Sequence, residues 1–453
     1  MTLGGLAGYR PQQAQGERMS IKGKAYVMGV YEHPTRDAPD KTTAQLHAES
    51  ARGALADAGL SFDDVDGYFC AGDAPGFGAM SMVDYMGLKN VRHMDTTETG
   101  GSSYIVHLHH AAQAIAAGKC SVALITLAGR PRNGGNRPGG GGGGRPPAGL
   151  TDGAPEQGFE SIYGGSTHNT YGMCAMRHMH EYGTTSEQLA WIKVAASHHA
   201  QWNEHAFLKS VVTVEDVLNS RMIADPLHLL DCCVVTDGGG AVVVTSPEVA
   251  RTLKRPMVKL IGAGEAPKLQ MGGKGLDLTT SGAVWSGPAA FAEAGVTPSD
   301  IKYASIYDSF TITVLMQIED LGFCKKGEGG RFVADGNLIS GVGKLPFNTD
   351  GGGLCNNHPT NRGGITKIIE AVRQLRGEAH PMVQVPNCDL ALANGTAIHA
   401  IVTLGAVQEL GLAAGGTAEV VIKASSIILG VPNRDLASNR QGGMAEATLR
   451  TGP

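Results

Sequence analysis

Apolar residues recur along the chain with two distinct spacings. The stretch "TTAQLHAESARGALADAGL" (42–60) has apolar residues at helical spacing and ends near Gly59, a frequent C-cap residue, which predicts an amphipathic helix. The run "SVALITLAG" (121–129) is apolar without alternation, as in a strand buried on both faces of a sheet. Between them, "DTTETGGSSYIV" (95–106) predicts a glycine turn and a helix start, where Ser102 and Ser103 would cap the helix by accepting hydrogen bonds from its first N–H groups.

The second half of the chain repeats the pattern of the first. "ALADAGLSFDDVDGYFCA" (54–71) matches "AFAEAGVTPSDIKYASIYDS" (290–309), since both predict a helix, an Ala-Gly stop, an acidic turn and a strand. "GGSSYIVHLHHAAQAIAAG" (100–118) corresponds in the same order to "GGITKIIEAVRQLRGEA" (363–379). The repetition predicts two halves of one topology, each with a mostly parallel sheet covered by helices.

A low-complexity stretch, "RPRNGGNRPGGGGGGRPPAGL" (130–150), interrupts the first half and predicts a surface loop. No Gly-Lys-Ser/Thr ending follows its glycines (134–144), so it is not a phosphate-binding loop, and its role stays open. The predicted units are an N-terminal half (22–128 with 229–275), an inserted loop domain (129–228), a C-terminal half (276–432) and a polar tail (433–453).

Composition excludes several classes of partner. The 453 residues carry a net charge of -5 and no basic run outside the glycine-rich stretch, so neither nucleic acid nor an anionic membrane surface is an expected partner. The sequence contains no run of roughly 18 apolar residues, which is the length needed to span a membrane. The eight cysteines form no regular framework and no CxxC pair, which indicates reduced thiols and a cytoplasmic location.

Two groups of side chains have spacings that could indicate a metal-binding site. They are His107, His109 and His110 in one stretch, and Cys174, His178 and His180 in another. Neither group is completed by a carboxylate in the sequence, and the first lies on an alanine-rich helix face. A packed or solvated face is the better interpretation, and no metal site is predicted.

Several stretches resemble the thiolase superfamily, in particular its sterol-carrier-protein-x-like, lipid-transfer-type branch. They include "TVEDVLNSRMIADPLHLLDCC", "VTDGGGAVVVTS" and "NTDGGGLCNNHPTNRGG", and the resemblance covers about residues 22 to 430. It implies an α/β protein with a duplicated α-β-α-β-α layered fold, two five-stranded sheets, two central helices and an inserted loop domain. It also implies a homodimer whose interface, above ~2,000 Å², would include the strand at 121–129.

The resemblance also implies positions for the chemistry. Thiolases place a nucleophilic cysteine at the N-terminus of the first central helix, and that position falls at Gly101, with Ser102 and Ser103 just beyond. The cysteine is missing. The "NNHP" motif retains the histidine that activates the nucleophile or polarises a thioester carbonyl, as His358, and "YDSF" places Tyr307 at the oxyanion-hole position.

The second cysteine of ordinary thiolases is also missing, because its position falls in "ALANGTA", near Asn394. Substrate binding is expected from residues around these positions: Gly101, Asn357, Asn394, Gly395 and Cys355. Cys355 is either a displaced base or a small buried filler. Ser102 and Ser103 are either helix caps or nucleophiles, and the second role would need His358 within hydrogen-bond reach.

Loss of both cysteines removes the acyl-enzyme route but leaves a pocket able to stabilise the enolate of a CoA thioester. The resulting hypothesis is retro-aldol cleavage of a steroid or arylalkanoyl β-hydroxyacyl-CoA, with His358 donating to the enolate oxygen and Tyr307 as the base. Acyl transfer by a non-cysteine thiolase site and a non-catalytic lipid-carrier or scaffold subunit are the alternatives. Coenzyme A enters as part of the substrate, and no tightly bound cofactor is expected. The resemblance also implies a small partner protein with an OB fold and a zinc ribbon.

Overall fold

The computed structural model describes residues 20–134, 167–268, 277–359, 363–395 and 398–404. Within them, nine strands form one mixed sheet in the order β3-β2-β4-β7-β1-β8-β11-β10-β9. The strands are β1 Tyr26–Glu32, β2 Gly67–Phe69, β3 His93–Asp95, β4 Val122–Gly129, β7 Gly238–Thr245, β8 Val258–Glu265, β9 Tyr303–Ile306, β10 Leu390–Asn394 and β11 Ile398–Leu404.

The predicted duplication is confirmed by the strand order. In the first half β2, β4, β7 and β1 are neighbours in that order, and β9, β10, β11 and β8 repeat it in the second half. The pair β2/β4 and its counterpart β9/β10 are parallel, whereas the strands that follow in each half pair antiparallel. Each half is therefore a mixed sheet and not the mostly parallel one that was predicted.

The two halves share one sheet instead of forming two separate five-stranded sheets. β1 and β8 pair antiparallel over a short stretch, with Tyr26 opposite Lys259 and Val27 opposite Val258. β1 and β8 are each an edge strand of their own half. Their pairing satisfies backbone N–H and C=O groups that would otherwise be unpaired at these edges. The first half contributes five strands and the described part of the second half contributes four. The predicted bounds (229–275) placed β8 in the N-terminal half, but β8 pairs along its length with β11 and belongs to the second half.

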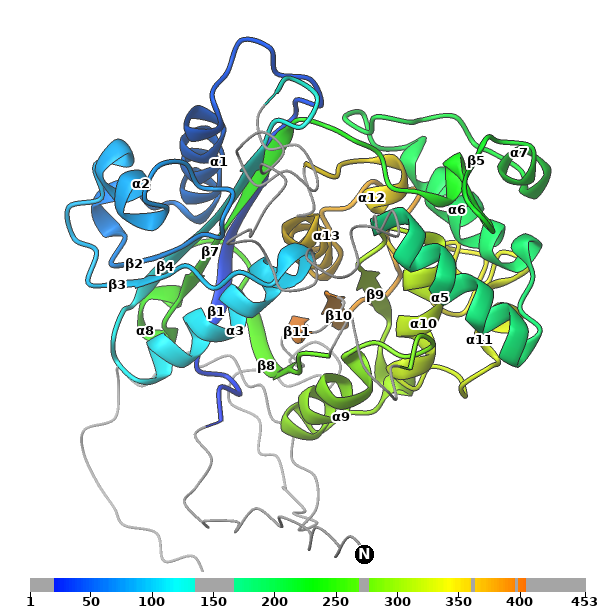
Figure 1. Cartoon of the computed structure of the whole chain (residues 1–453). Coiled ribbons are helices and arrows are strands. Elements are labelled where there is room, and N and C mark those ends of the chain that lie inside the picture. The colour runs from blue at the N-terminus through cyan, green and yellow to red at the C-terminus, as the bar shows by residue number, and fades with distance from the viewer. Residues whose placement is uncertain (1–19, 135–166, 269–276, 360–362, 396–397, 405–453) are drawn as a thin grey trace, which may run out of the picture. The chain divides into compact units, whose positions relative to one another are not determined.

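Helices cover both faces of this sheet and fill the space between its halves (Figure 1). Their bounds are α1 Thr43–Ala58, α2 Ala79–Met86, α3 Ser103–Ala116, α5 Thr167–Tyr182, α6 Ser186–Ala200, α7 Val214–Leu218, α8 Pro247–Ala250, α9 Ala283–Ala294, α10 Thr311–Asp320, α11 Gly329–Val333, α12 Gly352–Cys355 and α13 Gly364–Arg376. A small hairpin joins β5 Met222–Ala224 to β6 Leu227–His228.

The layers follow from which apolar residues pack together. One core cluster joins residues of α3 and α13 to strands of both halves, so these two helices are the central layer. A second cluster packs α1 and α2 on the first half, and a third packs α9 and α10 on the second half. The predicted α-β-α-β-α layering is thus confirmed.

The helix predicted at 42–60 forms as α1, and local chemistry explains its bounds. The Thr42 hydroxyl accepts from the backbone N–H of Gln45, whose side chain accepts from the Thr42 backbone N–H, so the helix begins with a capping box. It ends at Gly59, which has a φ of 75° that favours glycine.

The strand β4 confirms one expectation and overturns another. All eight of its residues are buried, as its unbroken apolar run predicted. It pairs with β2 on one side and β7 on the other, so the predicted place of this strand at a homodimer interface is wrong: no backbone edge is free to pair with another chain. The outer strand of the first half is β3.

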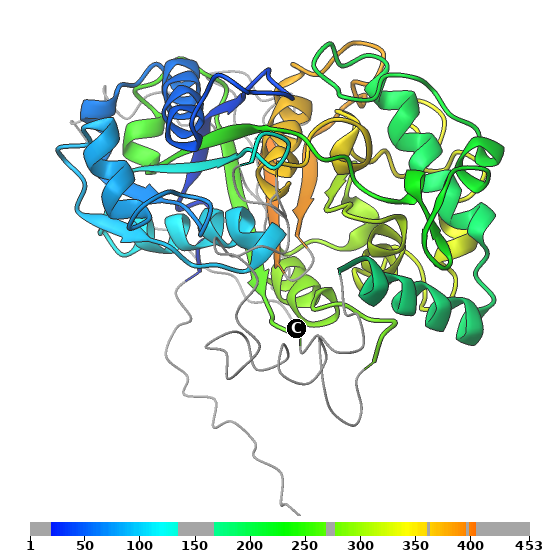
Figure 2. The same cartoon turned by 45° about the horizontal axis from the view of Figure 1, so that its top comes forward.

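The segment inserted between β4 and β7 of the first half packs on the second half. The helices α5 and α6 pack against α10, and α6 also contacts α11 and α12. Figures 1 and 2 show both helices on the side away from α1 and α2. None of the eight cysteines, all of which lie in the described ranges, forms a disulfide. No helix within the described part of the chain has the length and apolar character needed to cross a bilayer.

Candidate active site

Tyr307 and His358 face one another across two turns of the second half. Tyr307 directly follows β9, and His358 follows the short helix α12. The hydroxyl Oη of Tyr307 is hydrogen-bonded to Nε2 of His358 at 2.9 Å, and both residues are 5% exposed. The structure therefore brings together the two residues that the sequence singled out from positions 51 residues apart.

Burial raises the pKa of Tyr307 well above its usual value, and the nearby Cys233, Tyr171 and Asp308 add to the effect. A backbone hydrogen bond from Gly363 lowers the same pKa but does not offset burial. The phenol is therefore protonated at neutral pH. A protonated phenol donates to Nε2 of His358 when the imidazole proton is on Nδ1, and it accepts from the Nε2–H in the other tautomer.

The Tyr307 ring lies on Gly101, the position where thiolases carry their nucleophile. A Cβ at Gly101 would lie 2.1 Å from Cζ of Tyr307, and a Cβ at Gly364 would lie 2.1 Å from the Gly101 carbonyl oxygen. These close contacts bring the N-termini of α3 and α13 together at the phenol. Free N–H groups and helix dipoles at such ends favour negative charge.

Ser102 and Ser103 do not cap α3 as predicted. A 3₁₀ turn over Gly100–Ser102 precedes the helix, so Ser102 has a helical conformation (φ -83°, ψ -12°) instead of the extended one that an N-cap needs, and it makes no capping hydrogen bond. The Ser103 hydroxyl donates to the Gly100 carbonyl at 2.8 Å and accepts from the Thr99 N–H at 2.9 Å. It therefore holds the loop in front of the helix.

Asp308 ties the two turns together, which sequence reasoning missed. Its carboxylate accepts from the backbone N–H groups of Gly353 (2.9 Å) and Leu354 (3.1 Å) at the start of α12. Lys367 on α13 donates to the same carboxylate at 2.6 Å, and both side chains are 1% exposed. The residue after Tyr307 thus fixes the helix that leads to His358. The acid in "YDSF" was a visible signal, but its partner is 59 residues away.

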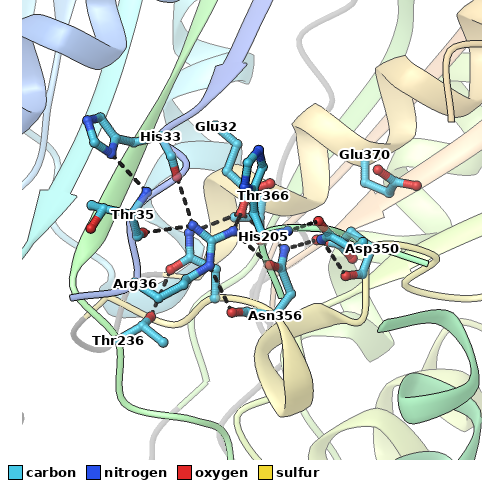
Figure 3. A network of polar contacts seen from close by, with 12 residues as sticks. Glu32, His33, Thr35, Arg36, His205, Thr236, Asp350, Asn356, Thr366 and Glu370 are labelled. Atoms are coloured by element: carbon cyan, nitrogen blue, oxygen red, sulfur yellow. Dashed lines mark hydrogen bonds and ion pairs between the residues drawn. The ribbon is translucent and has the colours of Figure 1, made fainter. Parts of the chain in front are cut away.

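Asn357 uses both ends of its amide within the protein. Its Nδ2 donates to Glu32 at 3.1 Å, and its Oδ1 accepts from Thr236 at 2.8 Å. The preceding Asn356 accepts from the Arg36 guanidinium at its side-chain oxygen (2.7 Å), within the network shown in Figure 3. Two residues near the end of β1 in the first half therefore hold the turn that carries His358 in the second.

The other predicted binding residues have different surroundings. Cys355 lies in the apolar cluster with α6 and α10, and burial raises its thiol pKa. Gly395 packs on Ser102, since a Cβ there would lie 2.7 Å from Oγ. The Asn394 carbonyl accepts from the Tyr307 N–H at 2.9 Å. Its buried side chain makes no hydrogen bond within the described part of the chain. It lies on the same face of β10 as Leu392, whose side chain belongs to the cluster facing α9 and α10.

Histidines of both groups considered for metal binding bond to groups of the protein. Burial lowers the pKa of His107 to about 4, and its Nε2 lies 2.9 Å from the Thr97 carbonyl oxygen. His110 pairs with Asp95 at 2.5 Å and with Glu265, and His178 pairs with Glu319 at 2.9 Å. Among the described residues, no three His, Cys, Asp or Glu side chains are arranged to hold a metal.

A hollow of about 430 Å³ lies near the C-terminal end of α3, lined in part by His93, His110 and Lys119. Tyr307 and His358 are not among the residues that line it. The chemistry of the site therefore follows from the Tyr307–His358 geometry at the N-terminal end of the same helix, and not from this hollow.

Comparison with known proteins places these features in a family. Residues 264–400 match the thiolase C-terminal domain-like family. The chain is 36% identical over 375 residues to a steroid side-chain-cleaving aldolase of Thermomonospora curvata, covering 79% of this chain and 91% of the relative. It is 35% identical to the 17-hydroxy-3-oxo-4-pregnene-20-carboxyl-CoA lyase of Mycobacterium tuberculosis, covering 79% and 92%.

A solved structure supports the same family. The Ltp2-ChsH2(DUF35) aldolase superposes with a TM-score of 0.74 at 32% identity, covering 85% of this chain and 98% of that one. The shared fold and the extent of these matches agree with one another. The chain belongs to the thiolase superfamily, in the group that includes the steroid side-chain-cleaving aldolases.

Proposed function

We propose that this chain cleaves a β-hydroxyacyl-CoA ester by a retro-aldol reaction, which releases a ketone or aldehyde and a shortened acyl-CoA. The observation that carries the proposal is the buried hydrogen bond between Tyr307 and His358, placed on Gly101 where a thiolase would hold its nucleophile. The relatives that act as aldolase and lyase support the same reaction, and the steroid substrates in their names favour a steroid side chain.

Tyr307 and His358 act as a proton relay. The β-hydroxyl gives its proton to Oη of Tyr307 while the phenol gives its own proton to Nε2 of His358, so no free phenolate has to form despite the raised pKa of Tyr307. The Cα–Cβ bond breaks, the β-oxygen becomes a carbonyl, and the electron pair moves to the thioester as an enolate. The proton then returns through Tyr307 to Cα.

This relay replaces the role first assigned to His358. In the tautomer that the relay needs, Nε2 accepts from the phenol and carries no hydrogen to donate to the enolate oxygen. The N-termini of α3 and α13 meet beside the phenol, and their N–H groups take over stabilisation of the enolate charge. Acyl transfer would need a nucleophile at position 101, where Tyr307 fills the space of a side chain.

The assembly is part of the proposal. The solved relative is a complex of Ltp2 with ChsH2(DUF35), and we extend a partner subunit of that kind, an OB-fold and zinc-ribbon protein, to this chain. We also propose a cytoplasmic homodimer that takes coenzyme A only as part of its substrate and binds no cofactor tightly. The outer strand β3 is the described edge of the first half from which such a dimer could form.

The test is product analysis by mass spectrometry, with and without the partner subunit. A β-hydroxyacyl-CoA with a tertiary hydroxyl on a steroid side chain should give a ketone and a shortened acyl-CoA without added coenzyme A. Turnover of only a β-ketoacyl-CoA, with a strict requirement for free coenzyme A, would replace the lyase by a thiolase. Absence of turnover on both substrates would favour a carrier or scaffold subunit.

A further inference from the structure

The segment between the β5–β6 hairpin and β7 passes between the two turns of the site. The Cys233 N–H donates to the Ser309 carbonyl, and the Val234 N–H donates to the Gly353 carbonyl, both at 2.9 Å. Two residues later, the Thr236 hydroxyl reaches His358 itself. This segment of the first half therefore contacts the turn after Tyr307, the helix α12 and the catalytic histidine in succession.

The Thr236 hydroxyl uses both of its hydrogen-bonding functions on the "NNHP" turn. Its oxygen accepts from the backbone N–H of His358 at 2.8 Å, and its hydrogen is donated to Oδ1 of Asn357 at 2.8 Å. Thr236 is completely buried, so no water can replace either bond. One hydroxyl thus sets the position of the His358 main chain and the orientation of the neighbouring amide.

The far end of that amide is anchored by charge. Asn357 donates to Glu32, whose carboxylate also accepts from Arg36 at 2.7 Å. Burial raises the pKa of Glu32, but Arg36, Arg373 and the two asparagine amides lower it below its usual value, so this carboxylate is ionised at neutral pH.

The Arg36 guanidinium is itself fully engaged. It donates five hydrogen bonds, of 2.7 to 3.0 Å, to Glu32 and to oxygens of His33, Thr35 and Asn356. Figure 3 shows this group between the end of β1 and the turn at Asn356. A rigid anchor of this kind resists movement of the turn because each shift would break several buried bonds.

We propose that Thr236 is a positioning residue for His358. Its hydroxyl, held through Asn357 by Glu32 and Arg36, keeps Nε2 of His358 at hydrogen-bond distance from the Tyr307 phenol. The inference rests on the proposed proton relay, because only a relay needs this distance to be preserved during the chemical step. Thr236 acts through His358 and has no direct role in the reaction.

Loss of the hydroxyl should act on chemistry more than on binding. Without it the His358 N–H and the Asn357 oxygen lose their partner in a dry site, and the turn can relax only by moving His358. Displacing a reacting group by about 1 Å can lower a rate by about 10²-fold. Thr236 and Asn357 are buried within the protein and bond to each other and to protein groups, so we expect KM to change little.

The experiment compares three valine and serine variants of two buried threonines. Thr236→Val keeps the side-chain shape and removes the hydroxyl, whereas Thr236→Ser keeps the hydroxyl. Thr245→Val is the matched control, because Thr245 in β7 is equally buried and its hydroxyl makes no hydrogen bond. The measurements are kcat, KM and the solvent deuterium isotope effect on kcat, made with the full chain and its partner subunit on the steroid β-hydroxyacyl-CoA.

For Thr236→Val we expect kcat to fall by roughly 10- to 100-fold, with KM within about twofold and a larger isotope effect because proton transfer becomes slower. Thr236→Ser should recover most of kcat, and Thr245→Val should match the wild type. If Thr236→Val and Thr245→Val had the same kcat and isotope effect, the positioning role would be overturned. If Thr236→Val does not fold, Asn357→Ser, which removes the link to Glu32, replaces it with the same expected split between kcat and KM.

These outcomes are separable from failure of the proposed function. A wild-type chain that releases no ketone from any β-hydroxyacyl-CoA rejects the lyase and the relay with it. A wild-type chain that releases ketone, with a Thr236→Val variant that keeps the wild-type kcat and isotope effect, rejects the positioning role and leaves the lyase intact.

Discussion

Gly101 and Tyr307 occupy one space: a Cβ at position 101 would lie 2.1 Å from Cζ and 2.2 Å from Oη of the tyrosine. Real Cβ atoms do not approach other atoms so closely, so a side chain at 101 and the present position of the phenol exclude each other. A nucleophilic side chain at position 101 and the Tyr307–His358 pair therefore cannot both be present. The first prediction tests this exclusion.

Gly101→Ala should displace the phenol and lower kcat by roughly 10²-fold or more, because a shifted Tyr307 no longer reaches His358. It should also lower the melting temperature, since the contact is buried. In a Tyr307→Ala background the same substitution should cost little stability, because the clash is gone. Equal destabilisation in both backgrounds would show that Gly101 matters for another reason.

Tyr307 and His358 should behave as a unit. Tyr307→Phe should lower kcat by roughly 10²–10⁴ and His358→Gln by roughly 10²–10³, both with little change in KM. Because each variant already interrupts the relay, the double variant should be about as slow as the slower single variant. Multiplied losses in steady-state kinetics would mean that the two residues act on different steps.

Ser103→Ala should cost about 1 kcal/mol of unfolding free energy and leave turnover largely intact. The hydroxyl bonds to the loop in front of α3, at Thr99, Gly100 and Glu98. Thermal unfolding and kcat are measured on the same preparation, with Ser102→Ala in parallel. A hundredfold loss of kcat with unchanged melting would restore a serine nucleophile.

Lys367→Met should destabilise the protein by about 3–5 kcal/mol, because it leaves the Asp308 carboxylate buried without its cation. Denaturant unfolding gives this value directly. The control is Lys344→Met, since Lys344 is exposed and should tolerate the change within about 0.5 kcal/mol. A loss in Lys367→Met no larger than in this control would show that the ion pair contributes nothing to the fold.

Stability should fall at alkaline pH through His110. Its hydrogen bonds with Asp95 and then Glu265 raise its pKa to about 9, above the ordinary 6.5. The pairing therefore contributes its full stability below about pH 6.5 and loses it as the pH rises through about 9. His110→Gln should remove about 1–2 kcal/mol at pH 6, a value reduced for partial exposure, and little at pH 10.

The control for this pH profile is His205→Gln, because the side chain of His205 is 45% exposed and pairs with exposed Glu204. Urea unfolding from pH 5 to pH 10 measures both variants against the wild type. An identical pH profile for His110→Gln and the wild type would assign the alkaline loss to other groups.

Periodicity and short motifs were enough to locate most elements and both members of the proposed catalytic pair. The apolar run at 121–129 and the capped helix at 42–60 depend on residues that are neighbours in the chain, so both can be recognised from the sequence. The duplication was equally visible, because each half repeats the same order of helix, stop and strand. Tyr307 and His358 stood out through the family resemblance of their motifs.

Tertiary structure alone decided how these pieces meet. The Glu32–Asn357 and Thr236–His358 contacts join residues 325 and 122 positions apart, and no spacing in the sequence announces them. The edge pairing of β1 with β8 and the helical conformation of Ser102 likewise depend on what packs beside them. Hydrophobic patterning fixes which face of an element is buried, but the partner of a buried polar group is chosen by the packing of distant segments, where each such group must find a hydrogen bond.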